Sequence, residues 1–414
     1  MKTALIHYWL VNDRGGEKVL AKFAEQFPDA ELFTHVYDPS AMPESIRRMN
    51  IRTPFIQKLP FAKTFYKNYL PLMPWALSRL DLSGYDLIIS SESGPAKGIR
   101  KPPGATHICY CHTPMRYLWD LSDEYARNAS LLQKIGMKIF RHWLRKWDLW
   151  SATQVDYFIA NSQFVAERIQ RIYNRDAEIL YPPVDVEHFS FLQRDPQDFY
   201  LFFGQLTAYK HADIAIKAFA KMGKKLIVAG DGEQMEFLKQ LATRASAEAL
   251  TTAGHSFPST PPGLRTPLRR RGIFEIPSSG GGPERRGGSL AGNLNISFLG
   301  RVSDEKRDEL YSQAKALIFP GIEDFGMVPV EAQAAGCPVI AFRGGGALET
   351  VVENQTGLFF DEQTPESLKD TVVRFESMKL DAQVCRKNAQ KFSVERFKSE
   401  FSQFVDDCNL DKMG

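Results

Sequence analysis

The stretch Phe319-Pro-Gly-Ile-Glu-Asp-Phe-Gly-Met-Val-Pro-Val-Glu-Ala-Gln-Ala-Ala-Gly-Cys-Pro-Val-Ile-Ala341 is the most informative part of the sequence. An apolar run ends near Phe319, and a helix is predicted to begin around Met327, with a proline in its first turn, where proline is tolerated. The free N–H groups of a helix start form an anion site. Glu323 and Glu331 flank this start, which suits a ligand with hydroxyls beside phosphates, such as a nucleotide sugar. The spacing alone equally allows Glu323 to be a turn residue and Glu331 to be a solvated helix residue, neither of which binds a ligand.

Similar apolar runs alternate with amphipathic segments along the rest of the chain. Most are continuous rather than alternating, which favours strands buried on both faces of parallel sheets. Repeated strand–helix units predict an α/β protein. The expected strands are Ala4–Trp9, Leu87–Ser90, His107–Tyr110, Tyr157–Ala160, Tyr200–Phe203, Lys225–Val228, Ile296–Leu299 and Ala316–Phe319, and the expected helices include Glu17–Phe27, Ser162–Ile172, Asp213–Met222 and Asp304–Gln313.

The length of 414 residues predicts more than one domain. A proline-rich segment near residue 190 reads as an interdomain link. We expect two doubly wound, Rossmann-like domains that face each other across a cleft, residues 1–190 and 191–395. Ligands of such sheets bind at the carboxyl ends of the strands. We expect residues 396–414 to form a helix that packs back on the first domain.

Residues 244–292 differ in composition from their surroundings. They contain nine Gly, six Pro and seven Arg, with no Lys and no Asp. Such a stretch cannot bury enough apolar surface to offset its ordering entropy, so we expect a disordered insertion within the second domain. The alternative is an arginine-rich clamp for an anionic partner.

Composition excludes several classes of protein. With 43% hydrophobic and 24% charged residues the chain is globular, and no run reaches the ~18 apolar residues of a membrane span. The N-terminus lacks a clean signal-peptide core, and the five cysteines have no metal-ligand spacing, which together favour a cytoplasmic protein with free thiols. A net charge of +3 is too small to indicate a nucleic-acid partner.

The stretch at 319–341 resembles the Glu-x7-Glu signature of retaining glycosyltransferases of family 4, which have the two-domain GT-B fold. The resemblance extends to Tyr200–Phe219, to Gly300-Arg-Val-Ser-Asp-Glu, to Ala229-Gly-Asp-Gly-Glu and to Arg14-Gly-Gly-Glu-Lys. Apart from the insertion it covers nearly the whole chain. It implies transfer of a sugar from a nucleotide-sugar donor, with no metal and no other cofactor, and the chain has no Asp-x-Asp metal clamp.

The resemblance also assigns roles to residues. Catalytic roles fall to Lys210, on the departing diphosphate, and to Glu323, on the donor sugar. Gln205 stands where the family often carries arginine, so we expect a compensating cation elsewhere, because a neutral donor makes a weaker bond than a charged one. The implied donor-binding residues are Gly15, Gly16, Gln205, Arg301, Val302, Phe325, Gly326, Met327 and Glu331, with Glu331 on the ribose hydroxyls and residues 301–302 near the base.

A loop at 109–120, Cys-Tyr-Cys-His-Thr-Pro-Met-Arg-Tyr-Leu-Trp-Asp, follows an expected strand. Rings and polar tips at a strand end suit sugar recognition. The family match makes His112 a third catalytic candidate, touching the transferred sugar, with Arg116, Tyr117 and Trp119 on the acceptor side. This loop resembles family members that assemble bacterial surface polysaccharides, often mannosyltransferases, which implies GDP-mannose as donor and a glycan or polyprenyl-linked acceptor.

Two stretches combine basic and aromatic residues, Phe55–Leu80 and Lys134–Trp147. A basic amphipathic helix with tryptophans is typical of peripheral contact with an anionic membrane, here at the inner face of the cell membrane. Ordinary core packing with a solvated basic face is the alternative. For the whole chain, the alternatives to a retaining glycosyltransferase are a nucleotide-sugar epimerase on a similar fold and a non-catalytic nucleotide-sugar-binding relic.

Overall fold

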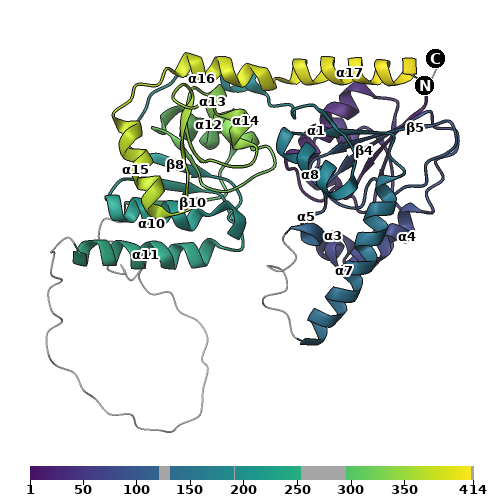
Figure 1. The fold of residues 1–414 in the computed structure, drawn as a ribbon, viewed down its shortest axis with the longest axis horizontal. Helices are drawn as coiled ribbons and strands as arrows, with labels where there is room; N and C mark the ends of the chain where they lie inside the picture. The colour runs from purple at the N-terminus through teal and green to yellow at the C-terminus, as the bar shows by residue number, and fades with distance from the viewer. Residues whose placement is uncertain (121–130, 191, 253–294, 412–414) are drawn as a thin grey trace, which may run out of the picture.

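The computed structural model describes residues 1–120, 131–190, 192–252 and 295–411. It contains two parallel sheets, each in its own domain (Figure 1). The first has the order β3-β2-β1-β4-β5-β6-β7 and the second β10-β9-β8-β11-β12-β13, and every strand pair in both is parallel. The predicted α/β class with two doubly wound sheets is therefore confirmed.

The strands of the first sheet are β1 (Thr3–His7), β2 (Glu31–Thr34), β3 (Asn50–Arg52), β4 (Leu87–Glu92), β5 (Thr106–Cys111), β6 (Tyr157–Ala160) and β7 (Glu178–Ile179). Residues of β1, β4 and β5 are buried throughout, as expected for strands with helices on both faces. The helices of this domain are α1 (Gly15–Gln26), α2 (Glu44–Arg47), α3 (Ala62–Phe65), α4 (Met73–Leu77), α5 (Arg116–Trp119), α7 (Leu131–Ala152) and α8 (Gln163–Tyr173), with 3-10 turns η1 (Pro39–Ala41), η2 (Phe55–Lys58) and η3 (Tyr66–Leu72).

The second sheet consists of β8 (Tyr200–Phe203), β9 (Leu226–Ala229), β10 (Ile296–Gly300), β11 (Leu317–Phe319), β12 (Val339–Phe342) and β13 (Gly357–Phe360). Its helices are α9 (Val186–Ser190), α10 (Ala212–Met222), α11 (Met235–Thr252), α12 (Asp304–Gln313), α13 (Met327–Ala334), α14 (Ala347–Thr350), α15 (Pro365–Glu376) and α16 (Ala382–Ala389), with η4 (Ala208–Lys210) and η5 (Gln390–Phe392). Because α11 continues to Thr252, residues 244–252 are helical, which corrects the start of the expected insertion. Most of that stretch, residues 253–292, lies outside the described residues.

The last helix, α17 (Val394–Asp411), returns to the first domain. Figure 1 shows it running from beside α16 across to the first sheet. Its Phe397 and Phe401 rings lie 5.5 and 4.6 Å from the ring of Phe23 in α1, within the core of the first domain. The helix therefore ties the two domains together.

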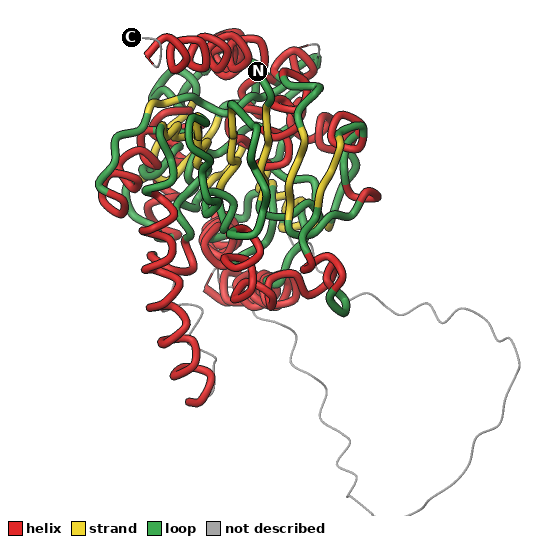
Figure 2. The backbone as a smooth tube through the Cα atoms, turned by 90° about the vertical axis from the view of Figure 1, so that its right-hand side faces the viewer, coloured by secondary structure: helices red, strands yellow, loops and turns green. Residues whose placement is uncertain are grey.

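Figure 2 shows the strands between layers of helix, with one long helix, α7, extending beyond the body at the same end as in Figure 1. Among the described residues no helix has the length and apolar character needed to cross a bilayer. The five cysteines all lie among the described residues, where they are buried and form no disulfide bond.

Candidate functional site

A cleft of about 1210 Å³ lies between the two domains, at the carboxyl ends of strands from both sheets. Two parallel sheets that face each other present their strand ends to the same space, where ligands of doubly wound folds bind. The cleft collects sequence-predicted residues from both halves of the chain: Gly15, Gly16, His112, Arg116, Tyr117, Gln205, Lys210, Arg301, Val302, Glu323, Phe325, Gly326, Met327 and Glu331.

Trp119 is the predicted site residue that does not line this cleft. Its Nε1 donates to Asp148 Oδ2 at 2.8 Å, and the Arg145 guanidinium lies 4.8 Å from its ring. The indole therefore joins α5 to α7 inside the first domain. The sequence of this loop shows that its residue types suit sugar recognition. It does not show which of the side chains face the cleft and which face the interior of the first domain.

Two helix starts face each other across the cleft. α1 begins at Gly15 and α13 at Met327, and a Cβ placed on Gly15 would lie 3.2 Å from Met327 Sδ. A Cβ on Gly16 would lie 2.8 Å from the Tyr8 hydroxyl and 3.5 Å from His112 Nε2, so only glycine fits there without a shift of its neighbours. Free N–H groups and the positive ends of two helix dipoles thus border the same space, which favours an anion such as a diphosphate.

Lys210 and Glu323 form an ion pair within the second domain, with Nζ 2.9 Å from Oε1. η4 carries the lysine and the loop after β11 carries the glutamate. Burial disfavours the ammonium, but the Glu323 carboxylate more than offsets this and raises the pKa of Lys210. Arg116 acts in the opposite direction on that pKa, which places a second cation from the first domain close to Lys210.

Glu331 is buried in the first turns of α13 and has a partner from each domain. Lys18 Nζ, on α1, lies 3.3 Å from Oε1, and the Tyr311 hydroxyl donates to Oε2 at 3.1 Å. Lys18 was not predicted as a site residue, although it is the last residue of the Arg14-Gly-Gly-Glu-Lys motif. The carboxylate is thus held in place, and hydroxyl groups of a ligand would compete with a flexible lysine for it.

Asp324, which follows Glu323, joins the loop after β11 to the first domain. Its carboxylate accepts from Arg116 Nη2 at 2.6 Å and from Arg168 Nη1 at 2.7 Å, while its backbone oxygen accepts from Ser162 Oγ at 2.6 Å. The guanidinium of Arg116 is largely buried, and Asp324 more than offsets this burial and raises the pKa of Arg116. Sequence reasoning missed this contact, because its partners lie far apart in the chain.

A second cross-domain contact caps α8. The Glu349 carboxylate, on α14, accepts from the backbone N–H of Gln163 at 2.8 Å and of Phe164 at 3.2 Å. A carboxylate at a helix N-terminus satisfies free N–H groups and matches the dipole. With Asp324, it fixes the loop that carries Glu323 against the start of α8.

His112 is enclosed at the end of β5. Its Nε2 is 2.8 Å from Ser91 Oγ, and desolvation lowers the pKa of the imidazole to about 3. The ring is therefore neutral near pH 7 and serves as a hydrogen-bonding group rather than a cation.

Gln205 is exposed at the end of β8 and lines the cleft. Four arginines share this lining: Arg14, Arg116, Arg301 and Arg307. Of these, Arg116 is electrostatically coupled to Lys210. It is therefore the candidate for the compensating cation that the Gln205 position calls for.

Two family models match the chain: Glycosyltransferase Family 4 over residues 14–188 and Glycosyl transferases group 1 over residues 288–392. The chain is 27% identical over 283 residues to alpha-1,3/1,6-mannosyltransferase ALG2 of Kluyveromyces lactis (63% of this chain, 50% of the relative), and 26% identical over 326 residues to the protein of that name from Rhizomucor pusillus (70% and 64%). The chain thus spans less than two thirds of the length of these relatives.

Solved structures share the fold at 16% identity. The apo lipopolysaccharide outer core galactosyltransferase WaaB matches with a TM-score of 0.63 (98% of this chain, 99% of that one). Anabaena HepE in complex with UDP-glucose matches with a TM-score of 0.61 (98% and 100%). Sucrose-phosphate synthase from Thermosynechococcus elongatus gives 0.63 (99% and 100%).

Proposed function

We propose that the chain, which has the two-domain GT-B fold, is a glycosyltransferase that transfers mannose from GDP-mannose, with retention of configuration, to a glycan or lipid-linked oligosaccharide during surface polysaccharide synthesis. The observation that carries the proposal is the Lys210–Glu323 pair, which lines the same cleft as the starts of α1 and α13. The name of the ALG2 relatives supports mannose as the transferred sugar.

In the proposed reaction the bond from the anomeric carbon to the diphosphate oxygen breaks, and a bond from that carbon to the acceptor hydroxyl oxygen forms. Charge builds on the diphosphate, where Lys210, Arg116 and the N–H groups at the starts of α1 and α13 stabilise it. The hydroxyl proton passes to the departing diphosphate on the same face of the sugar. This front-face route needs positioned donors of hydrogen bonds around the leaving group, and those are the groups gathered here.

The carboxylates of Glu323 and Glu331 would contact different parts of the donor. Glu331, which is buried near the start of α13, would accept hydrogen bonds from the ribose hydroxyls. Glu323 would contact the sugar, and the neutral His112, which lines the same cleft from the first domain, would be a further hydroxyl partner. Residues Arg301 and Val302, after β10, would meet the base.

The donor is tested by incubating the purified protein with a panel of nucleotide sugars. A ligand that binds only the folded state raises its melting temperature. We expect GDP-mannose to give the largest shift and to release GDP when an acceptor glycan is added. A shift without any transfer across donors and acceptors would contradict the enzyme and leave only nucleotide-sugar binding.

We also propose peripheral contact with an anionic membrane. Phe61, Phe65, Trp75 and Trp143 expose large apolar surfaces, and Figure 1 places α3, α4 and α7 at one end of the first domain. Leu70 packs in the same cluster as Phe140 and Leu144 of α7, which joins the two basic–aromatic stretches. The side chains of residues 131–139, which include Lys134 and Lys138 of the second basic–aromatic stretch, are not among those that the structure describes.

Vesicle co-sedimentation tests this contact. Lysines near an anionic surface are worth about 1 kcal/mol each, so binding should weaken as salt rises. The double variant Phe61→Ser, Trp75→Ser should bind less, while Phe237→Ser, on α11 of the second domain, should not change binding. No binding to anionic vesicles at low salt would refute the proposal.

A further inference from the structure

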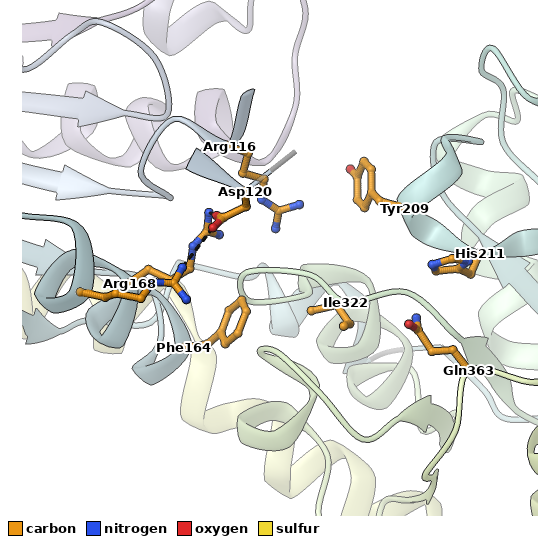
Figure 3. Close-up of a pocket in the computed structure, with 9 residues that line it drawn as sticks. Arg116, Asp120, Phe164, Arg168, Tyr209, His211, Ile322 and Gln363 are labelled. Carbon is orange, nitrogen blue, oxygen red and sulfur yellow. Dashed lines mark hydrogen bonds and ion pairs between the residues drawn. The ribbon is translucent and has the colours of Figure 1, made fainter. Parts of the chain in front are cut away.

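A second pocket, of about 370 Å³, opens between the domains beside the main cleft. Figure 3 shows its lining, with Arg116, Asp120, Phe164 and Arg168 from the first domain and Tyr209 and Gln363 from the second. Arg116 and Tyr209 line both this pocket and the cleft, and the Arg116 guanidinium lies 5.4 Å from the Tyr209 ring centroid. This pair therefore stands between the pocket and the catalytic cleft.

The charges in the pocket largely cancel. Asp120 pairs with Arg168 and with Arg171, whose Nη2 lies 3.0 Å from Oδ1, and Asp324 pairs with Arg116 and Arg168. Three arginines thus share two aspartates, which leaves a small excess of positive charge. This balance disfavours the binding of a phosphate, because a phosphate binds best to cations that are not already paired with carboxylates.

The remaining features suit a polyhydroxylated ring. Phe164 and Tyr209 present aromatic faces from opposite domains, and Figure 3 shows them on either side of the pocket. The Nε groups of Arg116 and Arg168 are buried and have no hydrogen-bond partner within the described structure. Planar polar groups that keep unused donors, together with aromatic faces, are what small-molecule sites use to orient a ligand.

We propose that this pocket binds the glycan chain of the acceptor, one sugar behind the ring that carries the attacking hydroxyl. The assignment rests on the proposed glycosyl transfer. An acceptor that enters through the pocket passes the Arg116–Tyr209 pair and reaches Glu323, which lines the adjoining cleft. The pocket then determines which glycan is extended, while the donor is recognised separately around Glu331.

Two variants test the assignment in opposite ways. Phe164→Ala removes one aromatic face but keeps the backbone N–H that Glu349 accepts. Gln363→Trp fills the pocket from the other domain. Phe237→Ala, an exposed aromatic on α11, is the matched control. The melting temperature of each variant shows whether it is folded.

The first measurement is binding. Saturation-transfer NMR with α-1,3- and α-1,6-linked mannose disaccharides and with mannose 1-phosphate uses probes that differ in charge. We expect disaccharide binding to the parent and to Phe237→Ala, and a loss of roughly tenfold in affinity in the two pocket variants. Disaccharide binding that is absent, or equal in all folded proteins, would overturn the assignment, as would a preference of the pocket for the phosphate.

The second measurement is turnover. With an active acceptor, the pocket variants should raise the acceptor KM about tenfold and leave the donor KM and donor hydrolysis by water unchanged. An acceptor KM within twofold of the parent would refute the pocket while leaving glycosyl transfer intact. If no donor supports transfer, the proposed function fails, and the NMR comparison still decides whether the pocket binds a glycan.

Discussion

Lys210 Nζ and Glu323 Oε1 lie 2.9 Å apart, so the cation proposed for the departing diphosphate and the carboxylate proposed for the sugar already hold each other in place. Neither is fully exposed, and the loop that carries Glu323 is itself tied to the first domain through Asp324. A preorganised site of this kind loses little energy to rearrangement when charge develops in the transition state.

Lys210→Ala should reduce turnover far more than stability. A comparable electrostatic donor is worth about 3 kcal/mol, or roughly 100-fold in rate, in the transition state. The variant also leaves Glu323 without its counter-charge, so the donor KM should rise as well. Steady-state kinetics and urea unfolding measure the two effects, and Lys217→Ala, which removes a surface pair with Asp213, is the control. Turnover within threefold of the parent would make Lys210 a structural cation.

Glu331→Ala should mainly weaken donor binding, by about 1–3 kcal/mol, because ribose hydroxyls lose their acceptor and the Tyr311 hydroxyl loses its partner. Lys18→Met should have a smaller effect or tighten binding, because it frees the carboxylate that ribose would use. Isothermal titration with the donor measures both variants. Equal losses in the two variants would mean that Lys18 itself contacts the donor.

Eight strands, β1, β4–β6 and β8–β11, and most of the cleft residues were predicted, because apolar runs and glycine-bearing loops are local features. Strands β2, β12 and β13 are also largely buried but were not expected. The short edge strands β3 and β7 could not be predicted, since β7 has two exposed residues and no apolar run. The cross-domain partners were also missed. Lys18 and Glu331 are 313 positions apart and Arg168 and Asp324 are 156 apart, and no local pattern relates such residues. The expectation that Trp119 lies on the acceptor side has a related limit, since its partner Asp148 lies on another helix and the sequence around Trp119 does not reveal this contact.

His35→Phe should reduce the pH dependence of stability. His35 is buried, neither ring nitrogen has a partner within the described structure, and burial lowers its pKa to about 3 from 6.5. Its unfolded state therefore binds a proton that the folded state does not, so the folded state loses stability as pH falls from 6.5 towards 3. The variant should remove up to about 1.4 kcal/mol per pH unit of that loss.

Urea unfolding of parent and His35→Phe at pH 7, 6 and 5 gives the comparison. The free energy of unfolding of the two proteins should diverge as pH falls, in favour of the variant. Other titrating groups, such as Glu92, whose pKa burial raises to about 7, affect both proteins alike and cancel in the difference. A difference that is constant with pH would show that the pKa of His35 is the same in the folded and the unfolded state.

The insertion should be removable without loss of activity if α11 is kept whole. Long loops cost little, about 0.6 kcal/mol for each doubling of length, so a short link in place of residues 253–292 should preserve folding. A longer deletion that joins Thr243 to Asn293 removes the last turns of α11, including Ala245, which packs against the second domain's core. We expect the shorter deletion to melt at the higher temperature. Insoluble protein from both deletions would show that the segment is needed for folding.

The product should keep the anomeric configuration of the donor. Retention can arise by a double displacement, in which a carboxylate attacks the anomeric carbon and leaves a glycosyl–enzyme adduct. It can also arise by departure and attack on one face, with the diphosphate taking the acceptor proton. Glu323 is the candidate carboxylate for such an attack, but its Oε1 is already paired with Lys210, which lowers its nucleophilicity and suits it to positioning. Proton NMR of the product's anomeric signal separates retention from inversion, and mass spectrometry of protein mixed with donor alone looks for the adduct. We expect retention without an adduct. Inversion would overturn the retaining assignment, and an adduct on Glu323 would replace the one-face route with the double displacement.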